Sequence, residues 1–200
     1  MKRILCSWAV LGLFLGAMGQ ARSDLMYFSE VFGGTIRRAN LDGTEETTLV
    51  GPLTTGPVGP ALDIAGGKMY WAENFTGEIW RANLDGTEPE NLVSGLDRPG
   101  RPALDLLGGQ MYWPEFRAGA ILRANLDGSG QETLIEGQNQ PTGIVLDVVG
   151  GLMYWANYMG GDIRRVNLDG SGEQTLVTGL RGPAFIALDF SACVPNGRRP

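Results

Sequence analysis

The residues of this chain that could carry chemistry are acids and aromatics, because its 200 residues include no histidine. Histidine is the usual general base near neutral pH, the centre of serine-type catalytic triads and a common ligand of zinc. Its absence weakens the hydrolase and lyase mechanisms that depend on it. The chemistry left open is a calcium ion held by carboxylates.

Two sets of aspartates recur at regular spacing. The first set follows a leucine every 42 residues and comprises Asp63, Asp105, Asp147 and Asp189. If these carboxylates converge on one axis they could hold calcium, but a residue present in every repeat is better explained as an acceptor for backbone N–H groups at a turn. The second set precedes a glycine and is predicted to form turns: Asp42, Asp85, Asp127 and Asp169. We therefore predict no metal site and no cofactor.

One loop of each repeat carries an aromatic residue preceded by an acid or amide. The aromatic residues are Phe32, Phe75, Phe116 and Tyr158, and the polar residues taken with them are Glu73, Glu115 and Asn157. Large aromatics with polar groups beside them are typical of protein and peptide sites. The alternative is that they only cover the edges of the repeats. We take these seven residues as the candidate ligand-binding set.

The elements that must position these residues are four internal repeats. Met26-Tyr27-Phe28 recurs as Met69-Tyr70-Trp71, Met111-Tyr112-Trp113 and Met153-Tyr154-Trp155, at spacings of 43, 42 and 42. In the unit from Pro102 to Gly137, glycines and Asp127-Gly128 separate short apolar or aromatic runs at 103–106, 110–113, 120–126 and 132–135. No helical spacing of apolar residues occurs in the unit. Four-stranded units of this length predict an all-β β-propeller; a solenoid is the competing fold, but its repeats are usually shorter.

The unit containing Met111-Tyr112-Trp113 and Ile121-Leu122-Arg123-Ala124-Asn125-Leu126-Asp127-Gly128 resembles the YWTD (class B) repeat of the low-density lipoprotein receptor family. The likeness extends from Met26 to Phe190. It implies a six-bladed propeller that holds protein ligands on one face. Two departures stand out: the family's threonine is lost and its aspartate is Glu or Asn, and only four repeats are present.

The propeller reading brings the aromatic loops together on one face with the blade-to-blade connections. It predicts an extracellular binding or scaffold module for a protein or peptide, and not an enzyme. The alternative is a propeller hydrolase or lyase with a channel calcium. A further set of residues recurs before the Asn-Leu-Asp-Gly segment and is expected to pair blades: Arg38, Arg81, Arg123 and Arg165.

The sequence does not decide whether the blades close into a ring. The first unit has three strands, the next three have four each, and a run at 185–190 could supply a sixteenth strand beside 26–30. Three arrangements are possible: a strained closed four-blade ring, an open arc capped by oligomerisation, or a fragment of a six-blade gene. Blade-packing geometry favours an open or incomplete arc, whose edges would allow self-association.

The first residues are typical of an export signal. Met1-Lys2-Arg3 precedes an apolar run from Ile4 to Gly19 and small residues that end at Ala21. We therefore expect a signal peptide at 1–21, propeller blades at 24–191 and a tail at 192–200, in a secreted (extracellular or periplasmic) protein with no membrane insertion once the signal is removed. Cleavage leaves 14 of the 16 basic residues against 22 acids, a formal net charge of −8, which argues against nucleic acid as a partner.

Overall fold

The structure is a computed structural model that describes residues 24–53 and 56–190. The expected signal peptide and the tail at 192–200 lie outside these residues. No helix in the described part of the chain is long and apolar enough to cross a membrane.

The described residues form fifteen strands in four antiparallel sheets, which we call blades 1 to 4. Blade 1 contains β1 (Leu25–Glu30), β2 (Thr35–Asn40) and β3 (Thr47–Val50). Blade 2 contains β4 (Pro57–Asp63), β5 (Lys68–Glu73), β6 (Glu78–Asn83) and β7 (Glu90–Ser94). Blade 3 contains β8 (Ala103–Asp105), β9 (Gln110–Glu115), β10 (Ala120–Asn125) and β11 (Glu132–Ile135). Blade 4 contains β12 (Pro141–Asp147), β13 (Leu152–Asn157), β14 (Asp162–Asn167) and β15 (Gln174–Val177).

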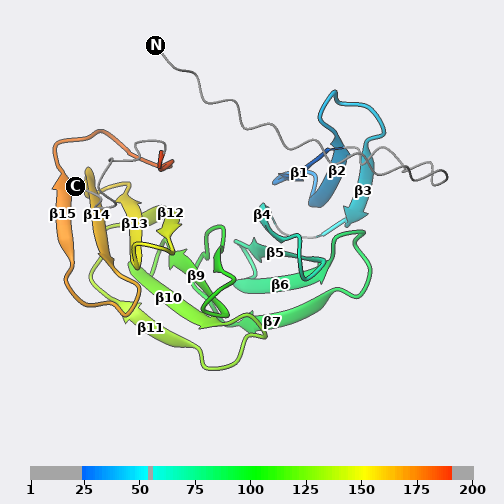
Figure 1. Cartoon of the computed structure of the whole chain (residues 1–200). Coiled ribbons are helices and arrows are strands. Elements are labelled where there is room, and N and C mark those ends of the chain that lie inside the picture. Colours follow the sequence, from blue (N-terminus) through cyan, green and yellow to red (C-terminus); the bar gives the residue numbers. More distant parts are fainter. Residues whose placement is uncertain (1–23, 54–55, 191–200) are drawn as a thin grey trace, which may run out of the picture.

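The strands of each blade pair in sequence order, and the blades follow one another round an arc (Figure 1). Blade 1 and blade 4 lie at opposite ends of this arc and share no strand pairing. The predicted four-stranded units and the three-stranded first unit are confirmed. The fold is a partial β-propeller, as blade-packing geometry favoured.

The hydrophobic core lies between the blades. In blades 1, 2 and 3 the tyrosine that follows the repeated methionine packs against the next blade, which contributes its own methionine and tryptophan. Between blades 2 and 3, for example, Tyr70 and Ile79 pack with Met111 and Trp113, and all four are buried. The same arrangement recurs in the clusters between blades 1 and 2 and between blades 3 and 4. One sequence unit therefore specifies both a blade and its packing on its neighbours.

Two arginines tie neighbouring blades together on the side far from the aromatic loops. The Arg81 guanidinium donates to the Leu126 carbonyl at 3.0 Å, and the Arg123 guanidinium donates to the Leu168 carbonyl at 3.0 Å. Arg81 and Arg123 therefore pair blades as predicted. Arg165 instead donates to Gln174 on the neighbouring strand of its own blade.

Residues 185–190 do not form the sixteenth strand. Each innermost strand pairs with the second strand of its own blade, as β12 does with β13. The segment begins beside β12, where Thr142 Oγ1 lies 3.5 Å from the Pro183 carbonyl oxygen, whereas β1 is at the other end of the arc. Pairing of 185–190 beside 26–30 is therefore excluded. Self-association through the open edges of the arc stays a prediction.

Candidate functional site

The aromatic loops and the blade-to-blade connections form one face, which we call the loop face. In every blade the last residue of the aromatic turn binds the connection that follows. The Leu96 amide donates to the Gly77 carbonyl at 3.0 Å, and the Gln138 amide donates to the Gly119 carbonyl at 2.8 Å. Gly77 has a φ of 75°, and a Cβ there would overlap the Leu96 carbonyl oxygen. The turn must therefore end in glycine, both for its left-handed backbone and for this close approach.

Three of the four predicted aromatics, in the turns of blades 2, 3 and 4, form contacts through their rings. The rings of Phe116 and Tyr158 lie 6.3 Å apart between centroids, tilted by 50°. The Arg98 guanidinium carbon lies 5.2 Å from the centroid of the Phe75 ring, a cation–π contact. Phe32, in the turn of blade 1, is fully exposed, and no described side chain forms a ring contact with it. The structure thus brings together Phe75, Phe116 and Tyr158 and leaves Phe32 apart.

The three predicted polar residues lie beneath the loop face and do not present their side chains to a ligand. Glu73, Glu115 and Asn157 are 2%, 7% and 1% exposed. Glu73 accepts a hydrogen bond from the Trp71 indole at 2.7 Å, and Asn157 donates to Gln138 at 3.1 Å. Their assignment as ligand contacts is corrected: they end the second strand of each blade, where the pleat directs the side chain into the space between blades.

The carboxylates of Glu115 and its counterpart Glu73 have different hydrogen-bond partners. Its carboxylate accepts from the Asp97 amide at 3.3 Å, while the buried Trp113 Nε1 has no hydrogen-bond partner among the described residues. Burial raises the pKa of the Glu115 carboxyl above its ordinary value; the bond from the Asp97 amide opposes this rise, and the nearby Asp97 charge adds to it. Glu115 therefore sits under Phe116 as a carboxyl group that holds its proton more tightly than usual.

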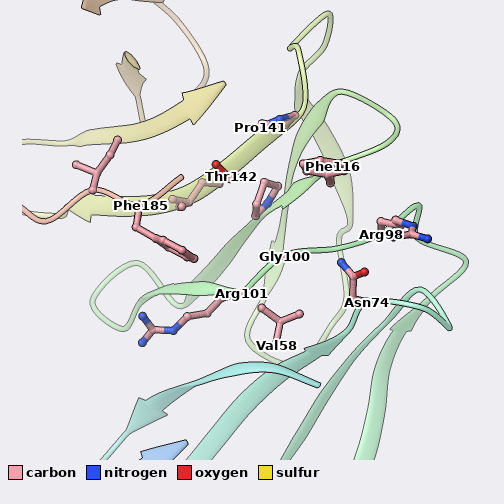
Figure 2. A pocket seen from close by; sticks show the side chains of 13 residues that line it. Val58, Asn74, Arg98, Gly100, Arg101, Phe116, Pro141, Thr142 and Phe185 are labelled. Atoms are coloured by element: carbon pink, nitrogen blue, oxygen red, sulfur yellow. The ribbon is translucent and has the colours of Figure 1, made fainter. Parts of the chain in front are cut away.

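A cavity of about 260 Å³ opens between blades 2, 3 and 4, under the aromatic loops. Its apolar wall includes Val58 of β4, Phe116 of the blade 3 turn, Ile144 of β12 and Phe185 beyond blade 4. Figure 2 shows the side chains of Val58, Phe116 and Phe185 entering this space from three separate segments. A cavity of this size accommodates a part of a ligand, such as one or two side chains, rather than a drug-sized molecule.

Polar groups at the cavity come from residues outside the candidate ligand-binding set. They are Asn74, Arg98, Arg101 and Thr142. Asn74 Nδ2 donates to the Pro99 carbonyl at 3.1 Å, which ties the blade 2 turn to the connection before blade 3. A signal for Arg101 was present in the sequence. The equivalent positions, 42 residues apart, hold Gly59, Arg101, Gly143 and Phe185, so this position breaks the repeat.

The backbone explains why this position faces the cavity. The innermost strands β4 and β12 have register shifts between Val58 and Ala61 and between Thr142 and Val145. A bulge of this kind bends a strand and redirects the side chain at the bend. Glycine at 143 is also required by packing, since a Cβ there would overlap the Ala184 carbonyl oxygen. Arg101 and Phe185 are the large side chains among the four equivalent positions.

The regularly spaced aspartates serve their own turns. The carboxylates of Asp63, Asp105 and Asp147 each accept the amide of the residue three positions later, at 2.7–2.8 Å. Asp127 accepts both the amide and the hydroxyl of Ser129, and the other three Asp-Gly turns repeat this arrangement. Within residues 24–53 and 56–190, no group of three or more His, Cys, Asp or Glu side chains is placed to hold a metal ion.

Comparison with solved structures relates this chain to propeller proteins. A nidogen structure, determined as a nidogen/laminin complex, matches with a TM-score of 0.76 and 25% identity over 82% of this chain and 64% of the other. The resemblance of the repeats to YWTD-type propellers is therefore confirmed in the fold. No family model and no curated protein matches the sequence.

Two bacterial proteins share the fold at lower identity. An inactive virginiamycin B lyase from Staphylococcus aureus, in a structure with quinupristin, matches with a TM-score of 0.67 and 21% identity over 82% of this chain and 56% of the other. A TolB-like protein from Agrobacterium tumefaciens matches with a TM-score of 0.64 and 17% identity, over 80% and 64% of the two chains. This chain therefore spans less than two thirds of the length of each of these structures.

Proposed function

We propose that this protein is a secreted binding module that holds a protein or peptide segment on its loop face. The observation that carries the proposal is the cavity between blades 2, 3 and 4, with Phe116 in its wall and Phe75 and Tyr158 beside it. An apolar hollow with aromatic side chains at its mouth is the kind of pocket in which binding hot spots form. The likeness to nidogen, solved in a complex with laminin, supports protein binding in general terms.

The proposal favours binding over catalysis. The side chains that line the cavity supply two arginines, one amide and one hydroxyl, and the other lining residues are glycine, proline or apolar. This set contains no carboxylate, thiol or imidazole that could act as a general base. Stoichiometric calcium in the purified full chain, measured by elemental analysis, would instead favour the propeller hydrolase or lyase.

A selection from random peptides tests the binding proposal. A phage-displayed library of random dodecapeptides is selected on the immobilised full chain, and the enriched peptides are synthesised for fluorescence polarisation. Phe116→Ala and Tyr158→Ala should each weaken binding by about 2 kcal/mol, which is typical of hot-spot aromatics. The thermal unfolding midpoint should change little.

The matched control is Leu107→Ala. Leu107 is also a large exposed apolar residue of blade 3, but it lies in the turn between β8 and β9, at the opposite end of β9 from Phe116. Its removal should leave peptide affinity unchanged. If no peptide is enriched, or if the aromatic variants bind as well as the natural chain, the loop face is not the binding site.

We propose secretion because the first residues place basic side chains before an apolar run and small residues after it. N-terminal sequencing of the protein from its native host should find a mature chain that begins near Arg22 or Asp24. An intact Met1-Lys2-Arg3 terminus on a soluble cytoplasmic product would contradict this part of the proposal.

A further inference from the structure

Three arginines surround the cavity and its rim. Arg98 and Arg101 line the cavity, and Arg98 also lines an adjoining hollow of about 230 Å³ together with Arg117, Phe116 and Gln140. The two hollows share Arg98 and Phe116, so they form one surface. No carboxyl group lines either hollow, and the nearest along the chain, Asp97 and Glu115, stand outside both.

These arginines differ from three others in the blades. Arg81 and Arg123 each form an ion pair with a glutamate on the neighbouring strand of the same blade, and Arg164 pairs with Glu173, just before β15. Within the described part of the chain, Arg98, Arg101 and Arg117 form no ion pair. The chain as a whole carries a formal net charge of −6, so the cavity opposes the sign of the rest of the molecule.

The structure holds two of these guanidinium groups in place. Arg98 has a φ of 58°, its carbonyl accepts the Phe116 amide at 3.1 Å, and its guanidinium rests on the Phe75 ring. A left-handed conformation at a residue other than glycine carries a conformational cost and persists where its surroundings impose it. Arg101 Nε donates to the Pro60 carbonyl at 3.2 Å, which leaves its terminal nitrogens for a ligand. Figure 2 shows Arg98 and Arg101 on either side of the Gly100 segment.

We infer that the ligand of the loop face is an acidic peptide segment, in which Asp or Glu carboxylates bind Arg98 and Arg101 and an apolar side chain enters the cavity between Phe116 and Phe185. Unpaired arginines that are already oriented match carboxylates by charge and by geometry. The apolar wall favours a peptide over a ligand made only of anionic groups. This inference rests on the proposed binding function and specifies its ligand.

The selected dodecapeptides provide the test. Enriched sequences should contain Asp or Glu next to a large apolar residue, and exchange of those acids for Asn or Gln should weaken binding about tenfold or more, because hydrogen bonds between charged partners are lost. Arg98→Gln and Arg101→Gln should weaken binding to a similar degree. Arg165→Gln is the matched control: it removes the same charge from blade 4, away from the cavity, without breaking an ion pair.

Three outcomes overturn the inference. Suppose that the selected peptides require Phe116 but bind equally well when their Asp and Glu residues are exchanged for Asn and Gln. This result would refute the acidic ligand and leave the binding function in place. Peptides that bind regardless of Phe116 would refute both. A full chain that is dimeric in sedimentation velocity, and monomeric as Arg101→Gln, would assign the cavity to a second copy of the chain.

Discussion

The packing between blades makes a quantitative prediction about two equivalent tryptophans. Trp71 and Trp113 occupy the same position in blades 2 and 3 and are 1% and 0% exposed. The Trp71 indole donates to the buried Glu73 carboxylate at 2.7 Å, whereas the Trp113 indole nitrogen has no partner among the described residues. Substitution by Phe removes the same atoms at both positions, and at position 71 it also changes the stacking on Trp80, whose ring centroid lies 6.3 Å from that of Trp71.

The difference between the two variants reports the hydrogen bond. Trp71→Phe leaves a buried carboxylate without this donor, which costs about 1–3 kcal/mol, whereas Trp113→Phe loses no hydrogen bond and removes an unsatisfied donor. We therefore expect Trp71→Phe to lower the free energy of unfolding by about 1–3 kcal/mol more than Trp113→Phe does. Adding Glu73→Gln to Trp71→Phe should recover part of the loss, because the buried charge is removed.

Urea unfolding followed by far-UV circular dichroism measures these differences, since fluorescence would change with the tryptophan itself. The slopes with urea should agree between variants, so that midpoints compare directly. Equal losses for the two variants, or a larger loss for Trp113→Phe, would refute the assignment of the Trp71–Glu73 bond. Replacing either tryptophan by alanine should lower the free energy of unfolding by about 3–5 kcal/mol.

Two further predictions concern the loop face. Gly77→Ala should destabilise the chain by well over the roughly 1 kcal/mol expected for an alanine in the left-handed conformation, because its Cβ would overlap the Leu96 carbonyl oxygen. Gly95 has a φ of 80° and open space where a Cβ would be, so Gly95→Ala should cost only about that 1 kcal/mol. Urea unfolding midpoints compare the two variants. Glu115→Gln should change the pH dependence of the melting temperature. The folded pKa of Glu115 is raised, so its contribution to stability is full below the unfolded pKa and is lost as pH rises through the folded pKa. The melting temperature of the natural chain relative to Glu115→Gln should therefore fall as pH rises from about 4, and a difference independent of pH would contradict it.

Local sequence was sufficient for the blades and their turns. Met111-Tyr112-Trp113 and Asp127-Gly128 specify a strand and a turn through the conformational preferences of a few adjacent residues, and repetition every 42 residues extends that to the whole chain. The structural roles of Asp105 and Arg123 were predicted for the same reason. A residue that recurs in every repeat meets similar neighbours wherever another blade follows, as Arg81 and Arg123 do, so much of its surroundings can be inferred from the sequence.

Tertiary structure decided which residues share a surface. Glu73 and Glu115 precede the loop aromatics in sequence, yet the strand pleat turns them into the space between blades, while Arg101 comes from a different segment and reaches the cavity beside Phe116. The run at 185–190 has the pattern of an innermost strand but forms none. A strand requires a partner and a cavity requires walls from several blades, and both depend on residues distant in sequence. The composition of each repeat thus determines a blade, whereas the site arises only where blades 2, 3 and 4 meet.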